Sequence, residues 1–162
     1  MKKLIGGIAA LAVIIAGGLY LLWSNPGTRP NGVLIRNPES NKVARVIDGD
    51  TIEMGDGSRV RYIGIDSPEA GDCYAAQATQ RNKELVEGKM VGMAAEPQDK
   101  DAYGRLLRYV YVDDGVFVNL ELVKGGYARA IYIVPDVSLY PELKAAQDAA
   151  RSAGLGLWGA CR

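Results

Sequence analysis

The sequence contains no histidine, and its charges cancel, with 19 lysines and arginines against 19 aspartates and glutamates. Without histidine the protein cannot use imidazole as a general acid or base, and it lacks a common zinc ligand. Residues 1–23 hold two lysines and no acid, so the rest of the chain carries 17 basic and 19 acidic side chains. That balance argues against the broad basic surface of a tight, non-specific nucleic-acid binder. A polyanion would have to be held by a local cluster of cations and a metal.

Cysteine is scarce as well, because Cys73 and Cys161 are the only two. In an oxidising compartment such a pair can form a disulfide, which here would close a loop of about 89 residues. Two free thiols are the alternative, since the sequence does not show whether the side chains lie close enough to bond. The disulfide is a hypothesis that fits an exported protein.

The first 23 residues differ from the rest of the chain. Lys2 and Lys3 precede an uncharged apolar run from Leu4 to Trp23, and its twenty residues are enough for a helix to span a bilayer. A cleavable signal peptide would show a shorter apolar run and an Ala-x-Ala-like site, and neither is clear here. We therefore expect an N-terminal membrane anchor helix with a cytoplasmic N-terminus, and a cleaved signal segment is the alternative.

Residues 24–40 are rich in proline, glycine and asparagine, which is typical of a linker. The folded domain is then residues 41–162. With an uncleaved anchor this domain would lie outside the cytoplasm, extracellular or periplasmic, and with a cleaved signal it would be secreted. About 120 residues are enough to bury a core without further covalent support.

Hydrophobic periodicity within the domain predicts both strands and helices. Segments in which apolar and polar residues alternate are typical of half-buried strands, and alanine-rich segments bounded by glycine or proline favour helices. The expected strands are 42–47, 51–54, 59–65, 89–95, 106–112, 116–118 and 127–134. The expected helices are 74–87, 119–124 and 141–153. This succession indicates an α+β domain, mainly β, with a barrel favoured over an open sheet.

Three acidic residues, Asp50, Asp66 and Glu69, lie at the ends of two adjacent apolar segments joined by a turn-rich tract. If the segments pair antiparallel as a hairpin, Asp50 comes close to Asp66. Two carboxylates with a third nearby suit a hard cation that prefers oxygen ligands. Arg61 lies on the second segment, on the side shared with two isoleucines, and it either extends past the strand end or enters a site. An arginine beside a cation site indicates an anionic substrate that bears phosphate.

Four short motifs, in this order, resemble the staphylococcal nuclease (thermonuclease) family. The motifs are Val46-Ile47-Asp48-Gly49-Asp50-Thr51, Gly64-Ile65-Asp66-Ser67-Pro68-Glu69, Asp101-Ala102-Tyr103-Gly104-Arg105 and Gly154-Leu155-Gly156-Leu157-Trp158. The resemblance covers roughly residues 42 to 158 and includes the tract from Val118 to Gly126. It implies a five-stranded OB-fold barrel with three helices. It also implies an endonuclease that hydrolyses DNA and RNA with calcium, cuts the bond to the 5′ oxygen and leaves 3′-phosphate ends.

The resemblance further assigns a role to each acidic residue. Asp50 and Asp66 would bind calcium through their carboxylates, and Ser67 through its main-chain carbonyl, at a position where the family usually has threonine. Calcium accepts such irregular sets of oxygen ligands. Glu69 would hold the attacking water as a general base.

Two arginines and two tyrosines complete the implied site. Arg61 and Arg105 would bind the scissile phosphate and stabilise the charge that builds up on it. Tyr103 and Tyr132 would line the nucleotide pocket. Nucleic acid is the expected substrate, and the membrane is the other expected partner. The protein is expected to be a monomer.

Two positions depart from the family pattern, with Ala102 where a lysine is common and Val134 where a second pocket tyrosine is expected. Together with the neutral net charge, these differences predict weaker binding of long nucleic acid than basic members show. A nuclease-fold module that binds nucleic acid without cleaving it is the alternative function, and a phosphodiesterase of small nucleotides is a third. Copies without activity typically lose an acidic ligand or an arginine, whereas this chain retains all five side chains.

Overall fold

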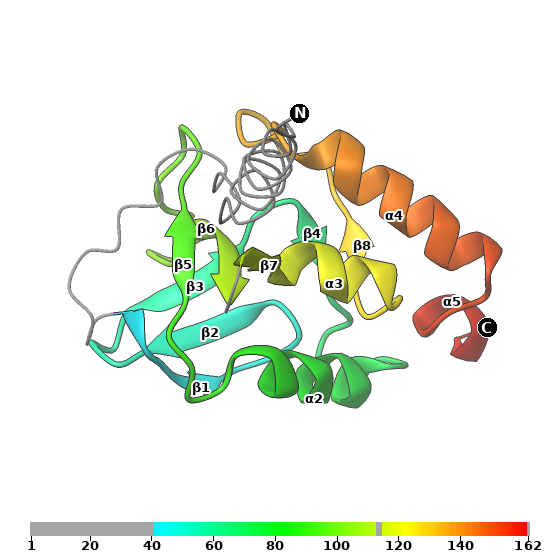
Figure 1. Ribbon diagram of the computed structural model, residues 1–162, viewed down its shortest axis with the longest axis horizontal. Coiled ribbons are helices and arrows are strands. Elements are labelled where there is room, and N and C mark those ends of the chain that lie inside the picture. The colour runs from blue at the N-terminus through cyan, green and yellow to red at the C-terminus, as the bar shows by residue number, and fades with distance from the viewer. Residues whose placement is uncertain (1–40, 113–114, 162) are drawn as a thin grey trace, which may run out of the picture. The chain divides into compact units, whose positions relative to one another are not determined.

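The computed structural model describes residues 41–112 and 115–161. The expected anchor, residues 1–23, and the expected linker, residues 24–40, lie outside this part of the chain. Among the helices of the described residues, none is both long enough and apolar enough to cross a membrane. The described residues form a mixed sheet with helices packed around it, in the mainly β variety of the α+β class that the periodicity predicts (Figure 1).

The main sheet has the strand order β1-β2-β3-β6-β5, with β7 paired to β6. Neighbouring strands are antiparallel except β3 and β6, which run parallel. A separate two-stranded sheet pairs β4 with β8. The strands are β1 (Val43–Val46), β2 (Thr51–Met54), β3 (Arg59–Tyr62), β4 (Ile65–Asp66), β5 (Gly92–Ala94), β6 (Leu106–Val112), β7 (Val116–Phe117) and β8 (Arg129–Ala130).

The two ends of the main sheet meet and close it into a barrel. Lys42, just before β1, forms an antiparallel bridge with Met90, just before β5. The N–H of Val91 donates to the carbonyl of Asn41 at 3.0 Å, which extends the same junction. Closure removes the open edges that a flat sheet would expose and leaves an interior for apolar side chains. The largest fully buried ones include Ile52, Met54, Val60, Tyr62, Ile65 and Val110.

In the described ranges of the chain, four helices surround the barrel. Three of them match the expected segments 74–87, 119–124 and 141–153 to within one residue at each end, and the short α5 was not expected. They are α2 (Ala75–Val86), α3 (Val118–Lys124), α4 (Tyr140–Ser152) and α5 (Leu157–Ala160). Helix α2 packs against β1, and α3 packs between β6 and α4 (Figure 1). These contacts bring α2 under the loop that carries Asp50.

The expected strand 59–65 is divided into β3 and β4 by a turn at Gly64. Gly64 has a φ of +74°, and a side chain there would come within 2.7 Å of Leu143 Cδ1. Only glycine fits both conditions. Because the turn interrupts the strand, the expected alternation of faces stops before Ile63 and Ile65, and both isoleucines are buried. Arg61 therefore does not have to share its face with them.

The expected strand 127–134 shortens to the two residues of β8. Its partner β4 is also two residues long, because Ser67 and Pro68 follow and proline has no N–H to continue the ladder. The apolar residues beyond β8 consequently leave the core. Tyr132, Ile133 and Val134 are all more than half exposed.

Candidate active site

The loop between β1 and β2 is shaped by contacts that bring Asp50 into the interior. The Asp48 carboxylate accepts a hydrogen bond from the N–H of Asp50 at 3.0 Å, the arrangement of an Asx turn. At Gly49 a Cβ atom would lie 2.6 Å from the Cβ of Ser67, so this approach requires glycine. Asn82 of α2 donates to the carbonyl of Asp48 at 2.9 Å. This hydrogen bond from helix α2 thus holds the loop in place.

Asp50 is a buried carboxylate with three polar contacts. Its Oδ2 accepts the N–H of Ser67 at 2.7 Å and lies 3.1 Å from Arg61 Nη1, and its Oδ1 accepts the hydroxyl of Thr51 at 3.1 Å. Burial raises the pKa of Asp50 above its ordinary value, against the lowering effects of Arg61 and of the Ser67 amide. A further positive charge beside this carboxylate would favour its ionised form.

The guanidinium of Arg61 joins the two aspartates. Its Nη1 lies 3.1 Å from Asp50 Oδ2, and its Nη2 donates to Asp66 Oδ1 at 2.9 Å. Nη1 also donates to the main-chain carbonyls of Tyr62, at 3.1 Å, and Ile65, at 2.8 Å. Asp50 and Asp66 therefore lie close together, as the hairpin hypothesis requires, because β2 and β3 pair antiparallel.

Arg61 retains donors for a substrate even though it is half-buried. Of its five N–H groups, those on Nη1 serve Tyr62 and Ile65, and one on Nη2 serves Asp66. Within the described residues, no hydrogen-bond acceptor occupies Nε or the second N–H of Nη2. These two groups remain available to the oxygens of an anion.

The oxygen atoms around Asp50 suit a hard cation such as calcium. Two carboxylates and the Ser67 carbonyl would be the protein ligands, and water would supply the rest. Asp66 contacts Arg61 through one oxygen, and its side chain is 46% exposed, which leaves room for a second contact. In the part of the chain that the structure describes, no three acidic, cysteine or histidine side chains are grouped to hold a metal.

A cleft of about 780 Å³ contains three of the other predicted site residues, Glu69, Tyr103 and Arg105. One of its lining residues is close in sequence to the aspartate pair, because Glu69 follows Asp66 by three residues. Arg59, which also lines the cleft, lies two residues before Arg61 on the same face of β3. The lining residues are Gly57, Ser58, Arg59, Glu69, Lys100, Tyr103, Gly104, Arg105 and Leu106.

The turn that holds Arg105 is organised by Asp101. Asp101 Oδ1 accepts the N–H groups of Tyr103 and Arg105, each at 2.9 Å, and Oδ2 accepts Arg105 Nε at 2.6 Å. Partial burial acts to raise the pKa of Asp101, but the hydrogen bonds from Arg105 and Tyr103 outweigh it and hold the pKa below its ordinary value. The guanidinium lies 5.5 Å from the Tyr103 ring centre. Neither Nη atom of Arg105 forms a hydrogen bond with residues 41–112 or 115–161, so both can bind an anion.

Tyr132 is the one predicted site residue that the structure does not bring to the aspartate pair or to the cleft. It is 61% exposed and packs edge-on against Tyr140, with 5.0 Å between ring centres. Of the two predicted pocket tyrosines, Tyr103 lines the cleft and Tyr132 does not.

Four residues with polar roles in this region were not singled out from the sequence. Asp101 had a signal, because an aspartate two residues before a Tyr-Gly turn is a common turn former. Thr51, Arg59 and Lys100 had none, since their roles depend on which strands become neighbours.

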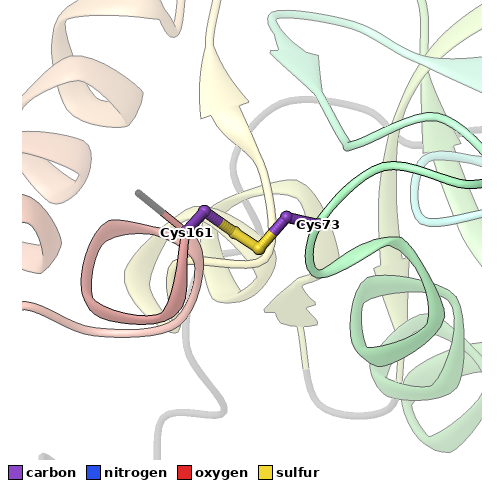
Figure 2. The surroundings of a disulfide bond; sticks show 2 residues. All are labelled: Cys73 and Cys161. Carbon is purple, nitrogen blue, oxygen red and sulfur yellow. A yellow bond between two sulfur atoms is a disulfide. The ribbon is translucent and has the colours of Figure 1, made fainter.

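The disulfide that the sequence left as a hypothesis is present. Cys73 and Cys161 are bonded, with their Cα atoms 5.8 Å apart. Figure 2 shows Cys161, directly after α5, joined to Cys73 in the loop before α2. That loop begins at Glu69, whose carbonyl accepts the N–H of Asp72 at 2.8 Å. The C-terminal end of the chain is thereby tied to the segment that carries Glu69.

Comparison with known proteins identifies the family. Residues 59–160 match the family described as staphylococcal nuclease homologue. The thermonucleases of Staphylococcus intermedius and Staphylococcus hyicus are 33% and 32% identical to this chain, over 98% of it and 99% of their own length. An uncharacterized endonuclease of Escherichia coli is 38% identical over 120 residues, which is 72% of this chain and 75% of that protein. A match that runs from β3 to α5, together with similarity to two thermonucleases over nearly the whole length, establishes that this chain belongs to the staphylococcal nuclease homologue family.

Proposed function

We propose that the protein is a calcium-dependent endonuclease that hydrolyses phosphodiester bonds in DNA or RNA. It cuts the bond to the 5′ oxygen and leaves 3′-phosphate ends. The observation that carries the proposal is the guanidinium of Arg61, which lies 3.1 Å from Asp50 and 2.9 Å from Asp66. This contact supports a site in which cation ligands and phosphate donors share one small volume. The names of the relatives, thermonuclease and endonuclease, support the same class of reaction.

Arg61 and Arg105 bind the phosphate and stabilise its transition state. Attack on a phosphodiester builds negative charge on the phosphoryl oxygens, and a planar guanidinium can contact two of them at once. Arg61 offers Nε and the second N–H of Nη2, and Arg105 offers Nη1 and Nη2. Each arginine is already held by an aspartate, so its orientation is set before the substrate arrives. Fixed donors of this kind are the most effective form of electrostatic catalysis.

Glu69 acts as the general base. It is exposed in the cleft, where its carboxylate can reach a water molecule. A proton passes from that water to Glu69 while the water oxygen bonds to phosphorus. The bond to the 5′ oxygen breaks, and the leaving oxygen takes a proton from solvent. Asp50, Asp66 and the Ser67 carbonyl would hold calcium, which would supply additional positive charge beside the phosphate.

Digestion of single- and double-stranded DNA and RNA, with calcium and with a chelator, tests this function. We expect cleavage only with calcium, and products whose 3′ ends release phosphate on phosphatase treatment. Glu69→Gln, purified in the same way, identifies contaminating activity. Binding without cleavage under every condition would favour the alternative of a nucleic-acid-binding module.

Calcium binding can also be measured without activity. A ligand that binds only the folded state stabilises it by about 2.7 kcal/mol when present at a hundredfold excess over its dissociation constant. We therefore expect saturating calcium to raise the melting temperature of the wild-type protein. Asp50→Asn, which removes one ligand charge, should abolish most of that increase. Equal increases in both proteins would contradict a calcium site at Asp50.

We also propose that the domain acts outside the cytoplasm as a monomer, either held to the membrane by residues 1–23 or secreted after their removal. The disulfide between Cys73 and Cys161 supports this location, because disulfides persist in oxidising compartments. Fractionation of cells with N-terminal sequencing distinguishes the two forms. An intact N-terminus in the membrane fraction identifies the anchor, and a shortened chain in the medium identifies the secreted form.

A further inference from the structure

The cleft beside the aspartate pair is rich in positive charge, although the chain as a whole is neutral. Three cations, Arg59, Lys100 and Arg105, line it together with a single acid, Glu69. Its volume of about 780 Å³ is in the upper part of the range of small-molecule sites, about 300–1,000 Å³. The cleft therefore has room for more than the one phosphate that Arg105 would contact.

Arg59 is only loosely engaged by its neighbouring acid. Its Nε lies 3.8 Å from Glu53, and its side chain is 59% exposed. Glu53 is already bound by Arg45, which donates to both of its carboxylate oxygens at 3.0 and 2.7 Å. Because Glu53 has a closer partner, the guanidinium of Arg59 is available to an anion.

Lys100 is likewise available. The two acids that flank it in sequence are taken by other cations: Asp99 by Arg108 and Asp101 by Arg105, each at 2.6 Å. No carboxylate of residues 41–112 or 115–161 forms an ion pair with Lys100, which is exposed. An exposed ammonium without a counter-ion is suited to binding a phosphate as a point charge.

The main chain of Arg59 and of Lys100 is held in place by pairing with neighbouring strands. Arg59 is the first residue of β3 and pairs with Glu53 on β2. Lys100 forms an antiparallel bridge with Leu106, and Leu106 pairs in turn with Val60 of β3. The two cations therefore extend from a connected set of strands, with only their flexible side chains left to adapt.

We propose that Arg59 and Lys100 form a second phosphate subsite, which binds a phosphodiester next to the one being cleaved. The proposal rests on the proposed nuclease function and specifies its substrate as a polynucleotide chain with several phosphates. A compound with one phosphodiester would fill only the part of the cleft near Arg105. The subsite contributes to binding of the chain and leaves the chemical step to Arg61, Glu69 and Arg105.

The test compares the double variant Arg59→Gln/Lys100→Gln with wild type on two substrates. One is a long single-stranded oligothymidylate, and the other is thymidylyl-thymidine, which contains one phosphodiester and no other phosphate. We expect kcat/KM on the long substrate to fall roughly tenfold through KM, and the slope of log(kcat/KM) against log[salt] to become shallower by about 1.4. On the dinucleotide, kcat/KM should stay within about twofold, because no second phosphate is present. Lys124→Gln/Lys144→Gln, which removes two exposed charges outside the cleft, should behave as wild type on both substrates.

The outcomes separate this proposal from the proposed function. If the wild-type protein cleaves neither substrate, the nuclease function itself fails. If wild type cleaves the long substrate and the cleft variant keeps its KM and salt slope, the second subsite is overturned while the function stands. An equal loss on the dinucleotide would also overturn it, because it would place the two cations at the scissile phosphate. Circular dichroism of both double variants establishes that the comparison concerns folded proteins.

Discussion

Asp50 and Tyr103 mark the two extremes of the candidate active site, since the first is 4% exposed and the second 85%. Around Asp50 the charges are paired by Arg61, which contacts both Asp50 and Asp66. Around Tyr103 the side chains of the cleft are mostly exposed, Arg59 has only a long contact with Glu53, and Lys100 has no ion pair with a described carboxylate. Substitutions in the buried part should therefore lower both activity and stability. Substitutions in the cleft should change catalysis or binding and leave stability unchanged.

The largest effect is expected from Arg61→Gln. Removing one partner of a buried ion pair leaves the other charge uncompensated, so the free energy of unfolding without calcium should fall by about 3–5 kcal/mol. Activity should fall by about 100- to 1,000-fold, because a fixed phosphate donor is lost. Urea unfolding and initial rates measure the two effects. The control Arg45→Gln removes an exposed arginine that also pairs with an acid, and it should leave both quantities nearly unchanged. Equal urea midpoints for all three proteins would contradict the difference between the two parts of the site.

Glu69→Gln should separate activity from stability. Because Glu69 is exposed, the free energy of unfolding should change by no more than about 0.5 kcal/mol. Loss of the general base should lower kcat by about 100- to 10,000-fold. Asp72→Asn in the same loop removes an exposed acid without a catalytic role and should keep the wild-type kcat. A similar kcat for Glu69→Gln and wild type would eliminate Glu69 as the base.

Replacing both cysteines should have an intermediate effect, mainly on stability. Opening a closed loop of this length is expected to reduce the free energy of unfolding by about 2–4 kcal/mol in the double variant Cys73→Ser/Cys161→Ser. Because Cys73 follows Glu69 by four residues, we also expect a modest decrease in kcat. Thermal unfolding with and without reductant measures the effect. Reductant should destabilise the wild type and leave the variant unchanged, and an identical response of the two proteins would argue against the bond.

The smallest effect is expected from the tyrosines. Tyr103 lines the cleft, so Tyr103→Ala should raise KM for single-stranded substrate by about fivefold or more, the usual contribution of one stacked base. Tyr132 lies outside the cleft against Tyr140, and Tyr132→Ala should raise KM less. Neither change should alter the urea midpoint, because both rings are more than half exposed. A larger increase in KM for Tyr132→Ala would place the base-binding surface beside β8.

Much of the fold was predictable because most elements have a clear local pattern. Alternating residues predicted β2 and β6, and bounding glycines and prolines predicted the three longer helices to within one residue. The errors occurred where a partner decides the length of an element. The strand expected at 127–134 ends after Ala130 because β4 offers it only two residues, and the strand expected at 59–65 is divided by the turn at Gly64.

The strength of nucleic-acid binding is a second property that composition alone does not predict. A neutral chain with Ala102 in place of the usual lysine predicts weak attraction to nucleic acid. The structure gathers Arg59, Lys100 and Arg105 around one cleft, and it pairs the two acids that flank Lys100 with Arg108 and Arg105. Net charge sums over the whole chain, whereas a substrate responds to the charges within a Debye length, about 8–10 Å at moderate salt.

The sequence by itself determined the family and the α+β class, and it predicted which acidic and arginine residues form the site. These depend on short motifs and local periodicity, which each segment carries alone. Only the tertiary structure decided that Arg61 lies between Asp50 and Asp66, that Cys73 and Cys161 meet, and which cations remain free in the cleft. Such contacts join residues that are distant along the chain, and they exist only once the barrel has closed and the helices have packed against it.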